Sequence, residues 1–117
     1  MQLSTLAHFR SGPVADRYQL SEALADVFVA EIAELVAAGC EHVQLEDLGA
    51  WIPTLSGDAD YAWVKRIVNR TLQGVSVRKS WHFCLGNAWG NRMQGMTARG
   101  YAAVLPHYYD VDVDEFV

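Results

Sequence analysis

A histidine and a cysteine stand two residues apart in the segment His82-Phe83-Cys84. Side chains at positions i and i+2 of a β-strand point to the same side of a sheet, so the imidazole and the thiol can reach a common point. Zinc accepts both ligand types, and His82 and Cys84 are therefore our candidate metal ligands. The pair alone is equally compatible with a structural role, because cysteine is often buried as a small apolar residue.

Two carboxylates, Glu46 and Asp47, follow the short, partly β-branched segment 40–45. One interpretation is a solvated turn that ends a strand. The other is capture of a cationic group, such as the ammonium of an amino acid, which makes both residues candidate substrate contacts. Asn87, in the glycine-rich segment 85–91, is either a turn residue or a further substrate contact. Trp51 and Trp89 follow strand ends, where a flat ligand could stack on an indole if these rings are not core residues.

Helix and strand patterns alternate around these candidates. Apolar residues at three- and four-residue spacing predict a helix from Ser21, its N-cap, to the glycine stop at Gly39. A second helix is predicted over 61–72, with Asp58 or Asp60 as its cap. The remaining predicted elements are strands at 40–45, 75–84 and 113–117 and a short helix near 100–109.

This alternation predicts an α/β fold with a parallel sheet. Ligands of such folds bind at the carboxyl ends of the strands, where Glu46 and Asp47 would meet His82 and Cys84. Since 117 residues are about half of the ~250 that a complete (β/α)8 barrel needs, we expect a partial TIM-type barrel of about three β/α units, incomplete on its own. Residues 1–17 would form a loop or arm, and residues 18–117 the barrel segment.

Charge excludes two classes of partner. The net charge is −5, from 14 acidic and 9 basic residues, so the chain lacks the cationic excess that nucleic acids or anionic membranes require. There is no signal-peptide pattern and no apolar run of the ~18–20 residues that span a bilayer. We expect a cytoplasmic protein, in which cysteines stay reduced.

The order of several motifs resembles the C-terminal catalytic barrel of cobalamin-independent methionine synthase and its shorter relatives, over residues 13–117. The matching segments are Ala37-Ala38-Gly39, Val43-Gln44-Leu45-Glu46-Asp47, Asp60-Tyr61 to Trp63, Gly74-Val75, His82-x-Cys84-x-Gly86-Asn87, Tyr101-Ala102-Ala103-Val104-Leu105-Pro106 and Val113-Asp114-Glu115-Phe116-Val117.

The resemblance implies a zinc-dependent methyltransferase. His82 and Cys84 would be zinc ligands, and the metal would hold a substrate thiol as its thiolate. Glu46 most directly, with Asp47, would bind the amino group of homocysteine, and a methyl-folate would be the donor. The family's Asp-Glu-Pro order is Glu46-Asp47-Leu48 in this chain, which leaves open another thiol, such as coenzyme M.

The resemblance also implies an incomplete site. The family's other zinc ligands, a glutamate and a second cysteine, lie on the next two strands, and Glu115 comes too early to be that glutamate. Whether the chain alone is an enzyme therefore stays open. A homo-oligomer or a partner chain would complete the barrel, and a non-catalytic subunit of such a partner is the remaining alternative.

Overall fold

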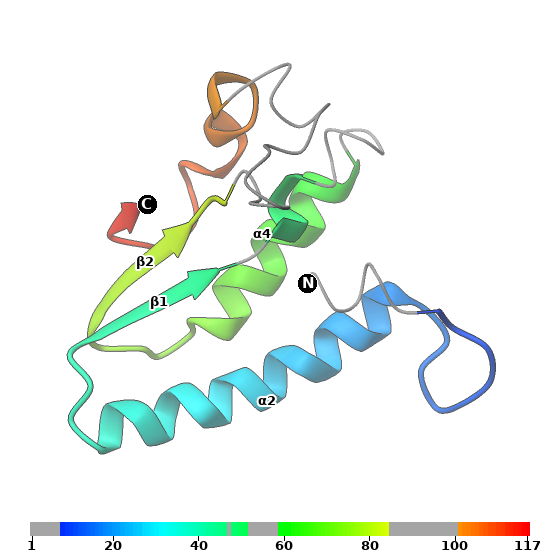
Figure 1. Ribbon diagram of the computed structural model, residues 1–117, viewed down its shortest axis with the longest axis horizontal. Coiled ribbons are helices and arrows are strands. Elements are labelled where there is room, and N and C mark those ends of the chain that lie inside the picture. Colours follow the sequence, from blue (N-terminus) through cyan, green and yellow to red (C-terminus); the bar gives the residue numbers. More distant parts are fainter. Residues whose placement is uncertain (1–7, 47, 52–58, 85–100) are drawn as a thin grey trace, which may run out of the picture.

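The computed structural model describes residues 8–46, 48–51, 59–84 and 101–117 (Figure 1). In chain order, their elements are α2 (Arg17–Ala37), β1 (His42–Glu46), the 3-10 helix η1 (Leu48–Trp51), α4 (Ala59–Thr71), β2 (Arg78–His82), the 3-10 helices η2 (Tyr101–Ala103) and η3 (Leu105–Tyr108), and β3 (Glu115–Phe116). The strands form a parallel sheet in the order β1-β2-β3. The predicted α/β class and parallel sheet are confirmed.

The prediction of a partial TIM-type barrel is wrong. The described residues form two α-helices and one three-stranded sheet, which is too small and simple for three β/α units. In place of the helix predicted near 100–109, residues 101–108 form η2 and η3, and β3 has only two residues. Pro106 explains the difference: inside a continuous helix it would lack an N–H donor and clash with the preceding turn, whereas it is tolerated at the start of η3.

Helix α2 begins before its predicted start. Asp16 is the N-cap, and its carboxylate accepts a hydrogen bond of 2.9 Å from the Gln19 backbone N–H. Ser21, the predicted cap, lies within the helix, where its hydroxyl donates to the Arg17 carbonyl. The predicted stop is confirmed: Gly39 has a φ of +97°, and the amides of Gly39 and Cys40 donate to carbonyls of the last turn.

Helix α4 supplies much of the core. Its apolar side is buried together with residues of the sheet and of the C-terminal segment, and the buried apolar residues of α4 are Tyr61, Trp63, Val64, Ile67 and Val68. Ion pairs join α4 to α2: Arg70 contacts Glu22 and Asp26, and Arg17 contacts Asp60. These ion pairs link α4 to α2, which runs past the sheet (Figure 1).

The sheet has two chemically different faces, because side chains alternate along each strand. The apolar face consists of Val43, Leu45, Trp81, Phe83 and Phe116, which belong to the core or pack against it. The polar face consists of His42, Gln44, Glu46, Arg78, Ser80, His82 and Glu115, as the strand register requires. None of the helices in the described residues is long and apolar enough to cross a membrane.

Hydrogen bonds cross the strands on the polar face. The His42 Nε2 atom lies 2.9 Å from the Ser80 hydroxyl, and Arg78 donates to Glu115 at 2.7 Å. Hydrogen bonding to Glu115 raises the pKa of Arg78 above its ordinary value, so Arg78 stays protonated over the physiological range. These contacts link β1 to β2 and β2 to β3 on the polar face.

Candidate metal centre

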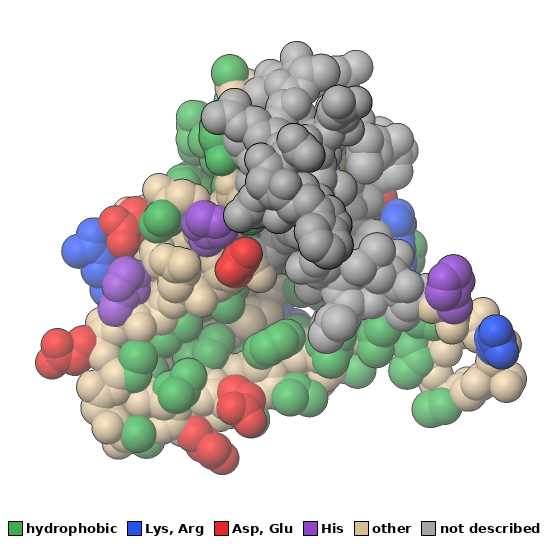
Figure 2. All heavy atoms as spheres, in the orientation of Figure 1, with side chains coloured by type: hydrophobic (Ala, Val, Ile, Leu, Met, Phe, Trp, Pro, Cys, Tyr) green, Lys and Arg blue, Asp and Glu red, His purple; other side chains and the backbone are tan. Residues whose placement is uncertain are grey.

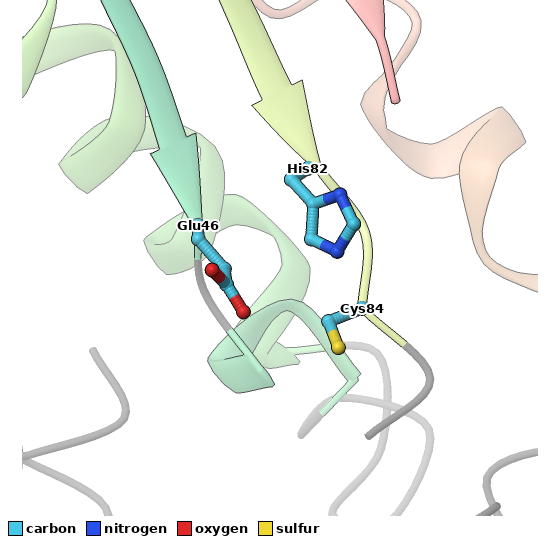
Figure 3. Close-up of side chains that lie close together, drawn as sticks. All are labelled: Glu46, His82 and Cys84. Carbon is cyan, nitrogen blue, oxygen red and sulfur yellow. The ribbon is translucent and has the colours of Figure 1, made fainter. Parts of the chain in front are cut away.

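Three side chains with metal-ligating atoms meet at the carboxyl ends of β1 and β2. A carboxylate oxygen of Glu46, a ring nitrogen of His82 and the Cys84 sulfur all lie within 4.8 Å of one another. Figure 3 shows the three side chains converging on the space between the two strand ends. Glu46 is exposed, whereas His82 and Cys84 are half-buried, so the cluster is open to solvent on one side.

Strand pairing accounts for the position of Glu46 and His82. Each is the last residue of its strand, and the parallel register of β1 and β2 places them directly opposite each other. Neighbouring residues of parallel strands that share a face lie about 5 Å apart, which is the spacing of the strands themselves. Pairing of the two strands therefore brings the carboxylate beside the imidazole without any special loop.

Cys84 lies two residues beyond the end of β2, and its position is held by hydrogen bonds other than those between β1 and β2. Its carbonyl accepts a hydrogen bond of 3.0 Å from the Trp51 indole. The preceding residue, Phe83, is held at both backbone atoms: its amide donates to the Val117 carbonyl, and its carbonyl accepts from the Tyr101 hydroxyl. The chain thus stays extended past the strand end, and Cys84 remains on the same side as His82.

Trp51 does not have the stacking role proposed from the sequence. Its ring is fully buried, with its centroid 5.6 Å from that of Tyr101 and 6.4 Å from that of Phe83. The indole therefore supports the backbone of Cys84 and offers no surface to a ligand. Trp89, the other proposed stacking residue, lies outside the described residues.

The donor set fits zinc. Zinc binds sulfur, imidazole nitrogen and carboxylate oxygen at ~2.0–2.3 Å, so ligand atoms on one tetrahedral ion lie about 3.5 Å apart. The three ligand atoms are now up to 4.8 Å apart. Side-chain rotations that move each atom by about an ångström would bring them to the spacing that zinc requires. Catalytic zinc sites typically combine three protein ligands with one exchangeable position, and the open side of this cluster leaves room for such a position.

The structure brings together three of the five residues predicted for the site. His82 and Cys84 lie together as their spacing predicted, and Glu46 joins them. The sequence analysis assigned Glu46 to the substrate, and its place within metal-binding reach was missed. Aligning the ends of the two predicted strands could have revealed it. Asp47 and Asn87 lie outside the described residues.

The other histidines and cysteine described are not part of this cluster. His42 lies at the opposite end of β1, where its ring contacts Ser80 and lies 3.6 Å from a Glu115 oxygen. The Cys40 thiol donates to the His42 carbonyl. His107 stacks on Tyr61 with a centroid separation of 3.9 Å. These three residues, His42, Cys40 and His107, thus have partners of their own outside the cluster.

Comparison of the chain with models of protein families, with curated proteins and with solved structures finds no match. The resemblance to cobalamin-independent methionine synthase therefore rests on the quoted motifs alone, and membership of that family stays a prediction.

Proposed function

We propose that this protein binds zinc through Glu46, His82 and Cys84 and transfers a methyl group to a thiol substrate. The observation that supports this most is the convergence of three donors of the kinds that zinc prefers, at the carboxyl edge of a parallel sheet. Zinc bound there would lower the pKa of a coordinated thiol, so that the sulfur is present as the nucleophilic thiolate near neutral pH.

The reaction proposed is a displacement at a methyl carbon. The thiolate sulfur of the substrate forms a bond to the methyl group of a methyl-folate as the methyl–nitrogen bond breaks. The electron pair of that bond stays on the donor nitrogen, which takes up a proton from solvent. The resemblance supports homocysteine as the thiol, and the Glu46-Asp47-Leu48 order favours a related thiol such as coenzyme M as the second candidate. We propose the cytoplasm as the location, since thiols stay reduced there.

The two candidate roles of Glu46 make different predictions. As a metal ligand, Glu46 contributes to zinc affinity, whereas as an ammonium-binding group it contributes only to the affinity for an amino thiol. The distance of its carboxylate from His82 and Cys84 favours the first role. We expect Glu46→Gln to weaken zinc binding at least tenfold, measured by competition with a chelating dye. Glu41→Gln, an exposed carboxylate just before β1, is the matched control and should leave zinc affinity unchanged.

If Glu46→Gln left zinc affinity unchanged and weakened homocysteine binding, Glu46 would be a substrate-binding residue and not a metal ligand.

The activity itself is tested by incubating the zinc-loaded protein with a methyl-folate and either homocysteine or coenzyme M. The expected product is the methylated thiol, detected by mass spectrometry. Failure of the purified chain to bind zinc would overturn the proposed function and favour a non-catalytic role.

A further inference from the structure

A groove of about 680 Å³ runs between α2 and β1. Its walls are mainly apolar: Leu24, Phe28 and Leu35 contribute from α2, and Val43 and Leu45 from β1. Figure 2 shows hydrophobic side chains along α2 and between this helix and the strand. The volume lies within the ~300–1,000 Å³ typical of sites for small ligands.

Helix α2 leaves this apolar surface uncovered by the residues that the structure describes. Its buried residues are only Ser21, Ala25 and Ile32. By contrast, Phe28 and Leu35 are 45% and 51% exposed, although they line the groove. Large apolar side chains that remain exposed beside a groove are typical of a binding surface.

The groove leads to the metal centre through Glu46. Val43 and Leu45 line the groove from the apolar face of β1, an edge strand of the described sheet. Glu46, the last residue of β1, also lines the groove and is one of the three clustered ligands on the polar face. A ligand whose polar end reaches the cluster would therefore pass the outer edge of β1 at Glu46 and lay the rest of its length against Val43 and Leu45. Figure 3 shows the Glu46 side chain between the end of β1 and the other two ligands.

Charge narrows the class of ligand. Glu31 and Glu46 line the groove, and no basic residue lines it among those described. An anionic chain would therefore meet like charges and apolar walls, both of which disfavour its binding. An uncharged apolar chain avoids both costs and removes apolar surface from water.

We propose that the thiol bound at this site carries an uncharged apolar chain, with its sulfur at the metal and its chain in the groove between α2 and β1. This inference rests on the proposed metal-dependent thiol chemistry and changes the thiol expected as its substrate. It favours alkyl thiols over homocysteine and coenzyme M, whose chains are short and charged.

The test compares two uncharged thiols that differ by four methylene groups, 2-mercaptoethanol and 6-mercapto-1-hexanol. Cobalt(II) replaces zinc, because its absorption bands report metal loading and its charge-transfer band reports thiolate binding separately. Each buried methylene should strengthen binding about fourfold. The longer thiol should therefore bind about two-hundredfold more tightly if the whole chain is buried, and more than tenfold more tightly if half of it is.

Substitutions in the groove test whether the difference in affinity between the two thiols arises there. Phe28→Ser and Leu35→Ser should each weaken binding of 6-mercapto-1-hexanol at least threefold and leave 2-mercaptoethanol unaffected. Phe9→Ser is the matched control, because Phe9 is 37% exposed and does not line the groove. All three side chains are partly exposed, and far-UV circular dichroism verifies that each variant keeps its fold.

The outcomes separate the two proposals. Cobalt binding with equal affinities for the two thiols would overturn the apolar-chain inference and leave the metal-dependent thiol function intact. The inference also fails if Phe9→Ser lowers the preference as much as Phe28→Ser does, because the gain would then come from a surface outside the groove. Absence of cobalt binding would overturn both proposals.

Discussion

The two faces of the sheet differ in burial and in what they contribute. On the apolar face, Trp81 and Phe83 are almost completely buried, and both rings pack against Tyr108. On the other side, Glu46 is exposed and His82 half-buried, at the ends of the same two strands. Since one face supplies the packing, residues of the other can be polar and face solvent with little loss of stability. Because side chains alternate along a strand, the same five-residue strand supplies core residues on one face and candidate metal ligands on the other.

The largest effect that we predict tests the apolar face. Trp81→Ala removes a fully buried ring whose centroid lies 4.5 Å from that of Phe83 and 5.0 Å from that of Tyr108. We expect a loss of about 3–5 kcal/mol in the free energy of unfolding, measured by urea denaturation, because the substitution leaves a cavity.

Tyr109→Ala is the control for this substitution. Tyr109 is 67% exposed, and its loss should cost less than about 1 kcal/mol. If Trp81→Ala cost no more than Tyr109→Ala, the core would not depend on the apolar face, and the contrast between the two faces would be refuted.

The second prediction concerns the polar face and separates metal affinity from stability. Cys84→Ser should weaken zinc binding more than about a hundredfold, since losing even an outer partner of a metal ligand costs 10–100-fold. The free energy of unfolding of the metal-free protein should change by less than about 1 kcal/mol, because the two side chains are similar in size. Isothermal titration calorimetry and urea denaturation measure the two quantities.

Cys40→Ser is the matched control, because Cys40 is the other cysteine and lies outside the cluster. Its zinc affinity should equal that of the unmodified protein. Equal losses of zinc affinity in both variants would show that metal binds nonspecifically to thiols, and the polar face would then have no defined metal centre.

The smallest predicted effect concerns an ion pair outside both faces of the sheet, and it gives a baseline for the effect of a surface substitution on stability. Lys65, on α4, donates a hydrogen bond of 2.8 Å to Asp110, and this bond lowers the pKa of Asp110 below its ordinary value of 3.8. The folded state therefore prefers the ionised carboxylate. The resulting stabilisation is fully present above the ordinary pKa and disappears as the pH falls through the lowered value.

Asp110→Asn should accordingly lower the melting temperature slightly at neutral pH and not at all in strong acid. The effect should be small, because the Asp110 side chain is 69% exposed and surface ion pairs contribute little. Thermal unfolding followed by circular dichroism over a pH series measures it. A deficit that persists at the lowest pH would show that Asp110 stabilises the fold by some means other than its charge.

The elements could be predicted where local patterns are strong. Apolar periodicity located both helices to within a few residues, and Gly39 marked the end of α2 because a left-handed residue is needed there. The short helix predicted near residues 100–109 is wrong: η2 and η3 occupy this segment, and Pro106, near the start of η3, is incompatible with the interior of a continuous α-helix. The barrel prediction came from the alternation of helices and strands and from the chain length, and it is wrong because the described residues form two α-helices and one three-stranded sheet.

The sequence by itself indicated that His82 and Cys84 lie on the same side of an extended segment, because the alternation of side chains is a local property of the backbone. Only the tertiary structure decided that Glu46 joins them, because its position depends on the register between two strands that are distant in the chain. The apolar groove likewise depends on the tertiary structure, because its walls come from elements that are distant in the chain. Periodicity marks the apolar side of α2, but packing against α4 and the sheet determines which of its residues stay exposed.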